Sequence, residues 1–274
     1  MIVDFITWLF ASERHKSAQI NPSRKRSGME INMEEKKERL NKYLASCGIC
    51  SRREADRLIA EGRVTVDGQT ASAGMQVCGR EKIMVNHKEV SGKKEKAVLA
   101  YYKPIGVTCT EKDRHAERKV CDELKYPVRL TYAGRLDKDS EGLLIMTNDG
   151  ELIDRMMRGA NCHEKEYQVR VDKVVTDEFL KGMASGVYLE DLDMTTRKCK
   201  VRRTGRYSFS MVLTQGVNRQ IRRMTESFGY RVRALKRTRV LNITLGELRP
   251  GEYRELQGEE LRNLYDECGE NGEA

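Results

Sequence analysis

The chain has 274 residues, of which 34% are charged and 6% aromatic, and its formal net charge is +9. This length allows two modest domains, each with a core of its own. The apolar run at the start carries Asp4 and is too short to span a bilayer, so neither a signal peptide nor a membrane span is expected. The positive charge suggests a polyanionic partner, although charge alone says little about function.

Eight cysteines are scattered along the chain, and two of them, Cys47 and Cys50, form a CxxC pair. No second CxxC and no paired histidines follow to complete a zinc site. Without a secretory signal, these cysteines are expected to be thiols in a reducing compartment. We therefore expect a cytoplasmic protein that needs no metal and no other cofactor.

Residues 1–37 are mostly polar after the apolar start, which predicts a disordered extension. A first folded domain is expected over residues 38–90. It begins with a short amphipathic helix over residues 39–46. Ser51 and Glu54 then form a capping box, which predicts a second helix ending at Gly62. Strands are expected at residues 63–66 and 82–85.

The second of these helices has an arginine-rich side formed by Arg52, Arg53 and Arg57. Arginines on an exposed helix face suit the phosphate backbone of RNA. The alternative is that this side is only a solvated surface. The sequence leaves both interpretations open.

A polar linker over residues 91–97 leads to a second domain, expected over 98–266, with an acidic tail at 267–274. Strands are predicted at 98–102, 143–147, 165–171 and 207–213. Helices are predicted at 151–158, after the cap Thr176, and at 219–228 after the cap Asn218. This alternation favours an α+β fold around a mixed, largely antiparallel sheet.

The most informative segment is residues 133–144, A-G-R-L-D-K-D-S-E-G-L-L, in which Asp137 stands at the tip of a glycine-bracketed turn. Such a turn holds a carboxylate rigidly at the edge of a sheet while leaving it open to a substrate. A calcium loop is one alternative, but its twelfth position would be Asn148, which offers no bidentate carboxylate. A purely structural turn is another.

Three parts of the sequence together resemble the RsuA-type pseudouridine synthases. They are the G-R-L-D turn, H-E-K-E-Y at 163–167 and Q-G-V-N-R-Q-I-R-R-M at 215–224. The resemblance runs from about residue 39 to 266. A segment of the first domain resembles the small S4 RNA-binding domain, which is helical and of the αL type. Its sequence is R-L-N-K-Y-L-A-S-x-G-x-C-S-R-R-E-A-D-R-L-I. Two further segments resemble the RluF branch of this family. Their sequences are R-G-A-N-C-H-E-K-E-Y-Q-V-R-V-D-K and L-K-R-T-R-V-L-N.

The resemblance implies a role for individual residues. Asp137 would be the catalytic carboxylate, Arg222 its ion-pair partner, and Tyr167 the side chain that stacks on the target base. Arg135 would help to hold the base out of its RNA stack. Arg222 could instead contact only phosphate, and Tyr167 could be a packed sheet residue. RNA-binding roles are also expected for Arg219 and Arg223, because eleven Lys or Arg residues stand against one acid between residues 202 and 239.

The implied reaction converts a uridine of 23S ribosomal RNA to pseudouridine, with tRNA as a candidate second substrate. It needs no redox step, phosphate donor or metal. The carboxylate could attack the sugar or take a proton from it, and the sequence does not choose between these routes. The alternatives are a uridine elsewhere in ribosomal RNA, including the small subunit, or a non-catalytic S4-type RNA-binding factor. A monomer is expected.

Overall fold

The computed structural model describes residues 37–110, 113, 116–158 and 162–269, all within one compact unit of the chain. The expected extension at 1–37 therefore lies outside the described residues, except for Lys37. None of the described helices is both long enough and apolar enough to cross a membrane.

The first part of the unit folds around two short helices, α1 (Leu40–Ser46) and α2 (Arg52–Ala60). The Ser51 hydroxyl accepts the backbone N–H of Glu54 at 3.2 Å, so the predicted capping box is confirmed at this bond. The apolar faces of both helices pack on small strands. These strands are β1 (Glu38–Arg39), β2 (Val64–Val66), β3 (Gln69–Thr70), β4 (Gln76–Val77), β5 (Ile83–Val85) and β6 (Lys88–Glu89). The strands pair as β1–β4 and as a sheet in the order β3-β2-β5-β6.

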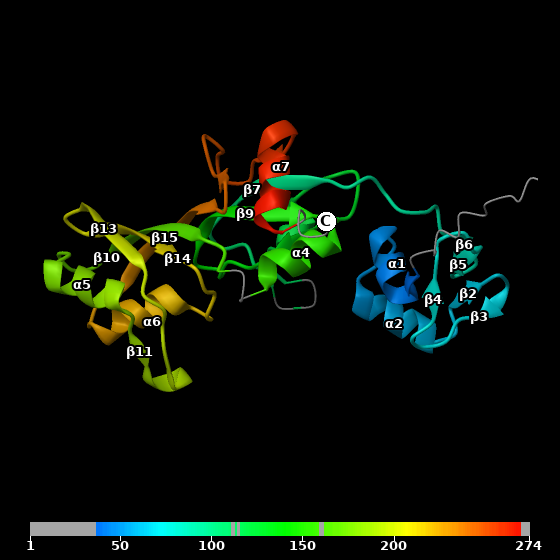
Figure 1. The fold of residues 1–274 in the computed structure, drawn as a ribbon, viewed down its shortest axis with the longest axis horizontal. Helices are drawn as coiled ribbons and strands as arrows, with labels where there is room; N and C mark the ends of the chain where they lie inside the picture. Colours follow the sequence, from blue (N-terminus) through cyan, green and yellow to red (C-terminus); the bar gives the residue numbers. More distant parts are fainter. Residues whose placement is uncertain (1–36, 111–112, 114–115, 159–161, 270–274) are drawn as a thin grey trace, which may run out of the picture. The chain divides into compact units, whose positions relative to one another are not determined.

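The second part is built on a nine-stranded sheet whose main path is β13-β14-β10-β15-β9-β7-β17 (Figure 1). Pairing is antiparallel except between β15 and β9, so the expected mixed, largely antiparallel sheet is confirmed. The strands on this path are β7 (Val98–Lys103), β9 (Glu141–Thr147), β10 (Lys165–Val171), β13 (Lys200–Gly205), β14 (Ser208–Leu213), β15 (Val232–Val240) and β17 (Tyr253–Glu255). Two strands lie off it, β8 (Thr131–Ala133) beside β9 and β16 (Ile243–Thr244) beside β15.

Helices cover different parts of this sheet. Helices α5 (Asp177–Ser185) and α6 (Gln220–Ser227) pack on β10, β14 and β15 through Phe179, Met183, Ile221 and Met224. Helices α4 (Gly150–Met157) and α7 (Gly258–Glu267) pack around β7 and β9. A short helix, α3 (Val120–Glu123), belongs to a separate core on the β7–β9 part. A small ribbon, β11 (Tyr188–Leu189) with β12 (Met194–Thr195), completes the described strands.

The parallel joint between β9 and β15 is unusually tight at Gly142, which pairs with Arg237. A Cβ on Gly142 would stand 2.3 Å from the carbonyl oxygen of Arg237, and its φ of +107° is one that side-chain-bearing residues rarely adopt. Only glycine fits this position. The two strands that meet here also flank the functional loop described below.

The structure corrects one predicted cap. Helix α6 begins at Gln220, and its N-cap is Arg219, which makes no side-chain capping bond. Asn218 therefore does not cap the helix as expected. Instead, the side chain of Gln220 reaches back and accepts the N–H of Val217 at 3.2 Å.

Candidate active site

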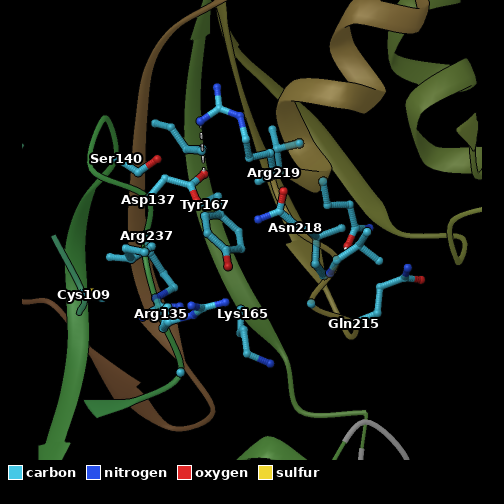
Figure 2. A pocket seen from close by; sticks show the side chains of 18 of the residues that line it. Cys109, Arg135, Asp137, Ser140, Lys165, Tyr167, Gln215, Asn218, Arg219 and Arg237 are labelled. Atoms are coloured by element: carbon cyan, nitrogen blue, oxygen red, sulfur yellow. Dashed lines mark hydrogen bonds and ion pairs between the residues drawn. The ribbon is translucent and has the colours of Figure 1, made fainter. Parts of the chain in front are cut away.

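A cavity of about 560 Å³ opens beside the sheet, and three separate segments of the chain meet in it (Figure 2). The loop between β8 and β9 supplies Asp137, β10 supplies Tyr167, and the segment before α6 supplies Arg219. All three predicted motifs therefore line one pocket. Strand pairing explains this meeting, because β10 lies next to β15 and β15 lies next to β9.

Backbone hydrogen bonds hold the Asp137 loop. The N–H of Ser140 donates to the carbonyl of Asp137 at 3.1 Å, and the N–H of Gly106 donates to the carbonyl of Lys138 at 2.8 Å. The side chain of Asp137 remains 32% exposed, within the pocket. Its backbone is thus fixed while its carboxylate stays accessible to a substrate.

The guanidinium of Arg219 lies beside this carboxylate, with Nη1 3.8 Å from Oδ2 of Asp137. It also contacts the carboxylate of Asp139, at 3.3 Å. The backbone of Arg219 has a φ of +52°, in the left-handed region. A non-glycine residue there carries local strain, which is typically kept at functional sites.

Arg222 has a different partner from the one expected. It is 8% exposed, and its Nη2 donates to the carbonyl of Asp139 at 2.9 Å and contacts the carboxylate of Asp139 at 3.1 Å. The same nitrogen donates to the hydroxyl of Ser140 at 3.3 Å. Within the described chain, Arg222 is therefore a buried anchor for the loop, and the guanidinium in ion-pair range of Asp137 is that of Arg219.

Tyr167 lines the pocket from the middle of β10. On β15 its direct neighbour is Arg237, and on β14 it is Met211. The ring is partly buried and packs against the core that α5 and α6 share with the sheet. This placement packs part of the ring against the core while the residue lines the cavity.

Two further cations of the pocket wall were not singled out from the sequence. Lys165 precedes Tyr167 by two residues, and burial, followed by the charge of Arg237, lowers its pKa below 10.5. Arg237 is 2% exposed and donates from Nε to the carbonyl of Leu143 at 2.7 Å. Both add positive potential to the site. The signal that could have placed Arg237 inward is its spacing of two from buried Leu235, but the neighbouring cations of the strand obscure that pattern.

A buried lysine also forms hydrogen bonds that hold the loop in place. Lys103, at the end of β7, is fully buried, and its Nζ donates to the carbonyls of Pro104 and Ser140, each at 2.8 Å. Burial lowers its pKa, and the carboxylates of Asp137 and Asp139 oppose that shift. The lysine thus ties the end of β7 to the loop that carries Asp137.

The other predicted site residues fall into separate groups. Arg135 lines the pocket, whereas Arg223 is in an ion pair with Asp191. On α2, Arg52 and Arg53 are exposed. Arg57 is exposed as well, but it forms intrahelical ion pairs with Glu54 and Glu61, the second at 3.1 Å.

The carboxylates that would have formed a calcium loop have protein partners instead. Asp139 contacts Arg219 and Arg222. Glu141 accepts the hydroxyl of Tyr102 at 2.7 Å. Among the described residues, no group of three His, Cys, Asp or Glu side chains is arranged to hold a metal ion.

Comparisons with known proteins agree with this geometry. A family described as RNA pseudouridylate synthase matches residues 97–227, and the S4 domain matches residues 38–83. The dual-specificity RNA pseudouridine synthase RluF of Salmonella typhi is 44% identical over 229 residues, which are 83% of this chain and 78% of that protein. The ribosomal large subunit pseudouridine synthase B of Bacillus subtilis is 35% identical, over 83% of this chain and 95% of its own length.

A solved structure, described as a crystal structure of pseudouridylate synthase, superposes with a TM-score of 0.62 at 26% identity. It covers 82% of this chain and 99% of its own. Such coverage extends over both the S4 region and the large sheet. The chain belongs to the RNA pseudouridine synthases, in the group that carries an N-terminal S4 domain.

Proposed function

We propose that the chain isomerises a uridine of 23S ribosomal RNA to pseudouridine, with Asp137 as the catalytic carboxylate. The observation that carries the proposal is the meeting of Asp137, Tyr167 and Arg219 in one pocket. The names of the similar proteins support a ribosomal large-subunit substrate, since one is a ribosomal large subunit synthase. The dual specificity in the other name supports a second RNA substrate, for which we propose tRNA.

The isomerisation requires little more than one carboxylate held beside the sugar of the target nucleotide. The C1′–N1 bond breaks, and its electron pair leaves with the base. Asp137 either bonds to C1′ or takes a sugar proton, and in both routes it is restored at the end. The freed base turns, C5 bonds to C1′, and the proton of C5 is lost while N1 gains one. Reactant and product are isomers.

The neighbouring groups have distinct tasks in this scheme. Arg219 places a positive charge beside Asp137, with Nη1 3.8 Å from Oδ2, and so helps to hold the carboxylate at its position in the pocket. Tyr167 offers a ring face to the extruded base. Extruding a base costs a few kcal/mol, which contacts between the RNA phosphates and cations such as Arg135 offset.

The decisive experiment is pseudouridine mapping in cells that lack the gene. Total 23S RNA, 16S RNA and tRNA are compared after complementation with the wild-type gene or with Asp137→Asn. We expect one or more sites in 23S RNA to depend on the wild-type gene and to remain uridine with the variant. Dependent sites confined to 16S RNA would overturn the proposed substrate, and restoration by Asp137→Asn would overturn the proposed carboxylate.

A further inference from the structure

The large sheet has a second face, which lies on the side away from the pocket. Along β10, Tyr167 and Val169 point toward α5 and α6, where they join the apolar core. Because side chains alternate along a strand, Gln168 and Arg170 point the opposite way. Both are exposed. The four strands β13, β14, β10 and β15 therefore have an outer face, on the side opposite α5 and α6 (Figure 1).

Strand register places cations side by side on this outer face. Arg202 of β13 pairs with Ser210 of β14, Ser210 with Gln168 of β10, and Gln168 with Lys236 of β15. The row crosses three strand spacings, about 14–15 Å. Arg170 lies next to this row, two residues along β10 from Gln168. A nucleic-acid strand with about 3.4 Å of rise per phosphate would place roughly four phosphates along such a row.

Acidic residues lie near this row, and one of them, Glu141 of β9, pairs in register with Lys236. At one end of the face, Glu164 pairs with Lys200 and Arg239, and Glu166 pairs with Arg239. Arg170, Arg202 and Lys236 have no carboxylate within ion-pair distance in the part of the chain that the structure describes. Arg170 and Arg202 therefore remain available to an anionic partner, and so does the ammonium of Lys236, which lies 5.4 Å from the centre of the Tyr102 ring.

The tip of the adjoining hairpin favours RNA over an acidic protein. Tyr207, between β13 and β14, is 39% exposed, and the guanidinium carbon of Arg206 lies 5.4 Å from the centre of its ring. An exposed aromatic ring beside cations is the composition of surfaces that bind unpaired nucleotides by stacking. An acidic protein would have no need of the ring.

We propose that Arg170, Arg202 and Lys236 form a second RNA-binding surface, on the opposite face of the sheet from the active site. The inference rests on the proposed function, since it assigns a further docking surface to the same RNA. An RNA that occupies both faces must pass around an edge of the sheet, and the edge strand β13 itself carries Arg202. The surface therefore acts on a large folded RNA and contributes nothing to a short one.

The test compares two triple variants of the full chain. The first is Arg170→Gln, Arg202→Gln and Lys236→Gln. The matched control is Lys125→Gln, Arg249→Gln and Arg262→Gln, which removes three exposed cations from outside this face. Binding to in vitro transcribed 23S RNA and to a 12-nucleotide oligouridine is measured from about 0.05 to 0.3 M salt, with melting temperature as a check on folding.

We expect the first variant to bind 23S RNA at least about tenfold more weakly at 0.1 M salt, and the slope of log Kd against log salt to fall by about 2. Oligouridine binding and the single-turnover rate at saturating 23S RNA should stay unchanged. A double variant with the conservative substitutions Arg170→Lys and Arg202→Lys should retain binding to 23S RNA, because it keeps both positive charges.

Three results would overturn the inference. They are a first variant that binds 23S RNA as the control does, an equal loss for oligouridine, or a lower saturated rate at unchanged Kd. Failure of the proposed function gives a different result. In that case wild-type protein would form no pseudouridine in 23S RNA, whatever the two triple variants did to binding.

Discussion

Arg219 Nη1 lies 3.8 Å from Oδ2 of Asp137, within ion-pair range but beyond hydrogen-bonding distance. The same guanidinium contacts Asp139 more closely, at 3.3 Å. Arg219 is thus shared between two carboxylates, one of which we assign to catalysis. When a substrate fills the pocket, a small movement of the Arg219 side chain would strengthen either contact at the expense of the other.

The two aspartates of the loop should therefore differ sharply on substitution. Asp137→Asn keeps the size of the side chain but removes the ionised oxygen, so pseudouridine formation should fall at least about 10³-fold with RNA affinity nearly unchanged. Asp139→Asn should lower the rate by only about tenfold, since it affects the arginines rather than the reacting atoms. Single-turnover assays on in vitro transcribed 23S RNA measure both, and equal losses would contradict the assignment.

Substitutions of the two arginines at the start of α6 should also have different effects, one on the rate and the other on stability. Arg219→Gln should lower the saturated rate by about 10–100-fold with little change in melting temperature, because the side chain is partly exposed. Arg222→Gln should cost about 2–3 kcal/mol of stability, because it removes a buried guanidinium and its bonds to the loop. Thermal denaturation and single-turnover kinetics together distinguish them. A stable but inactive Arg222→Gln protein would argue for a direct catalytic role of Arg222.

Tyr167 is expected to act through its ring. Tyr167→Phe keeps the stacking surface, so it should retain the rate within about tenfold, whereas Tyr167→Leu should lose about 1–3 kcal/mol of base stacking. The rate at saturating RNA and the half-saturating RNA concentration are measured for both. If Phe proved as damaging as Leu, the hydroxyl rather than the ring would be the functional group.

Gly142→Ala tests the joint between β9 and β15. The added Cβ would overlap the Arg237 carbonyl, and the backbone angle is unfavourable for alanine. We expect a loss of at least about 3 kcal/mol, seen as a much lower melting temperature. Gly216→Ala is the matched control, because a Cβ there would meet nothing within 4 Å. Equal stability of the two variants would show that the strands separate without penalty.

Asp149 links stability to pH. Burial alone would raise its pKa, but hydrogen bonds from Lys96 and Tyr265, the charge of Lys96 and the N–H of Leu152 bring it below 3.8. Its stabilising contribution is therefore complete above about pH 4 and is lost as the pH falls through the lower pKa of the folded state. Asp149→Asn keeps a helix cap but loses the charge, and should cost about 1–2 kcal/mol at pH 7. Melting curves at pH 7 and pH 3 should show the difference from wild type shrinking in acid.

Much of the local structure follows from sequence patterns. The alternation over β10 and the caps Ser51 and Thr176 are present as predicted, because these signals depend on neighbouring residues. Strand β15 was not predicted. Its sequence, V-R-A-L-K-R-T-R-V, is so rich in cations that charge obscures the alternation of buried Leu235 and Arg237, and the next buried residue, Val240, comes three positions later.

The detailed partners in the site could not be read from the sequence. Residue spacing places Arg219 and Arg222 on the same segment, but tertiary packing determines which one reaches Asp137. The left-handed backbone at Arg219 starts the helix one residue later than expected and turns that side chain toward the loop. No side-chain pattern in the sequence indicates such a backbone angle.

The close backbone contact at Gly142 bears on which parts of the sequence can change during evolution. Where two strands touch backbone to backbone, their spacing does not depend on the size of the surrounding side chains. The offset between β9, which follows the Asp137 loop, and β15, which carries Arg237, is then set at this point by main-chain atoms. Apolar residues of the flanking cores can therefore be exchanged over generations, with gains or losses in melting temperature, while the spacing of β9 and β15 beside the pocket is kept.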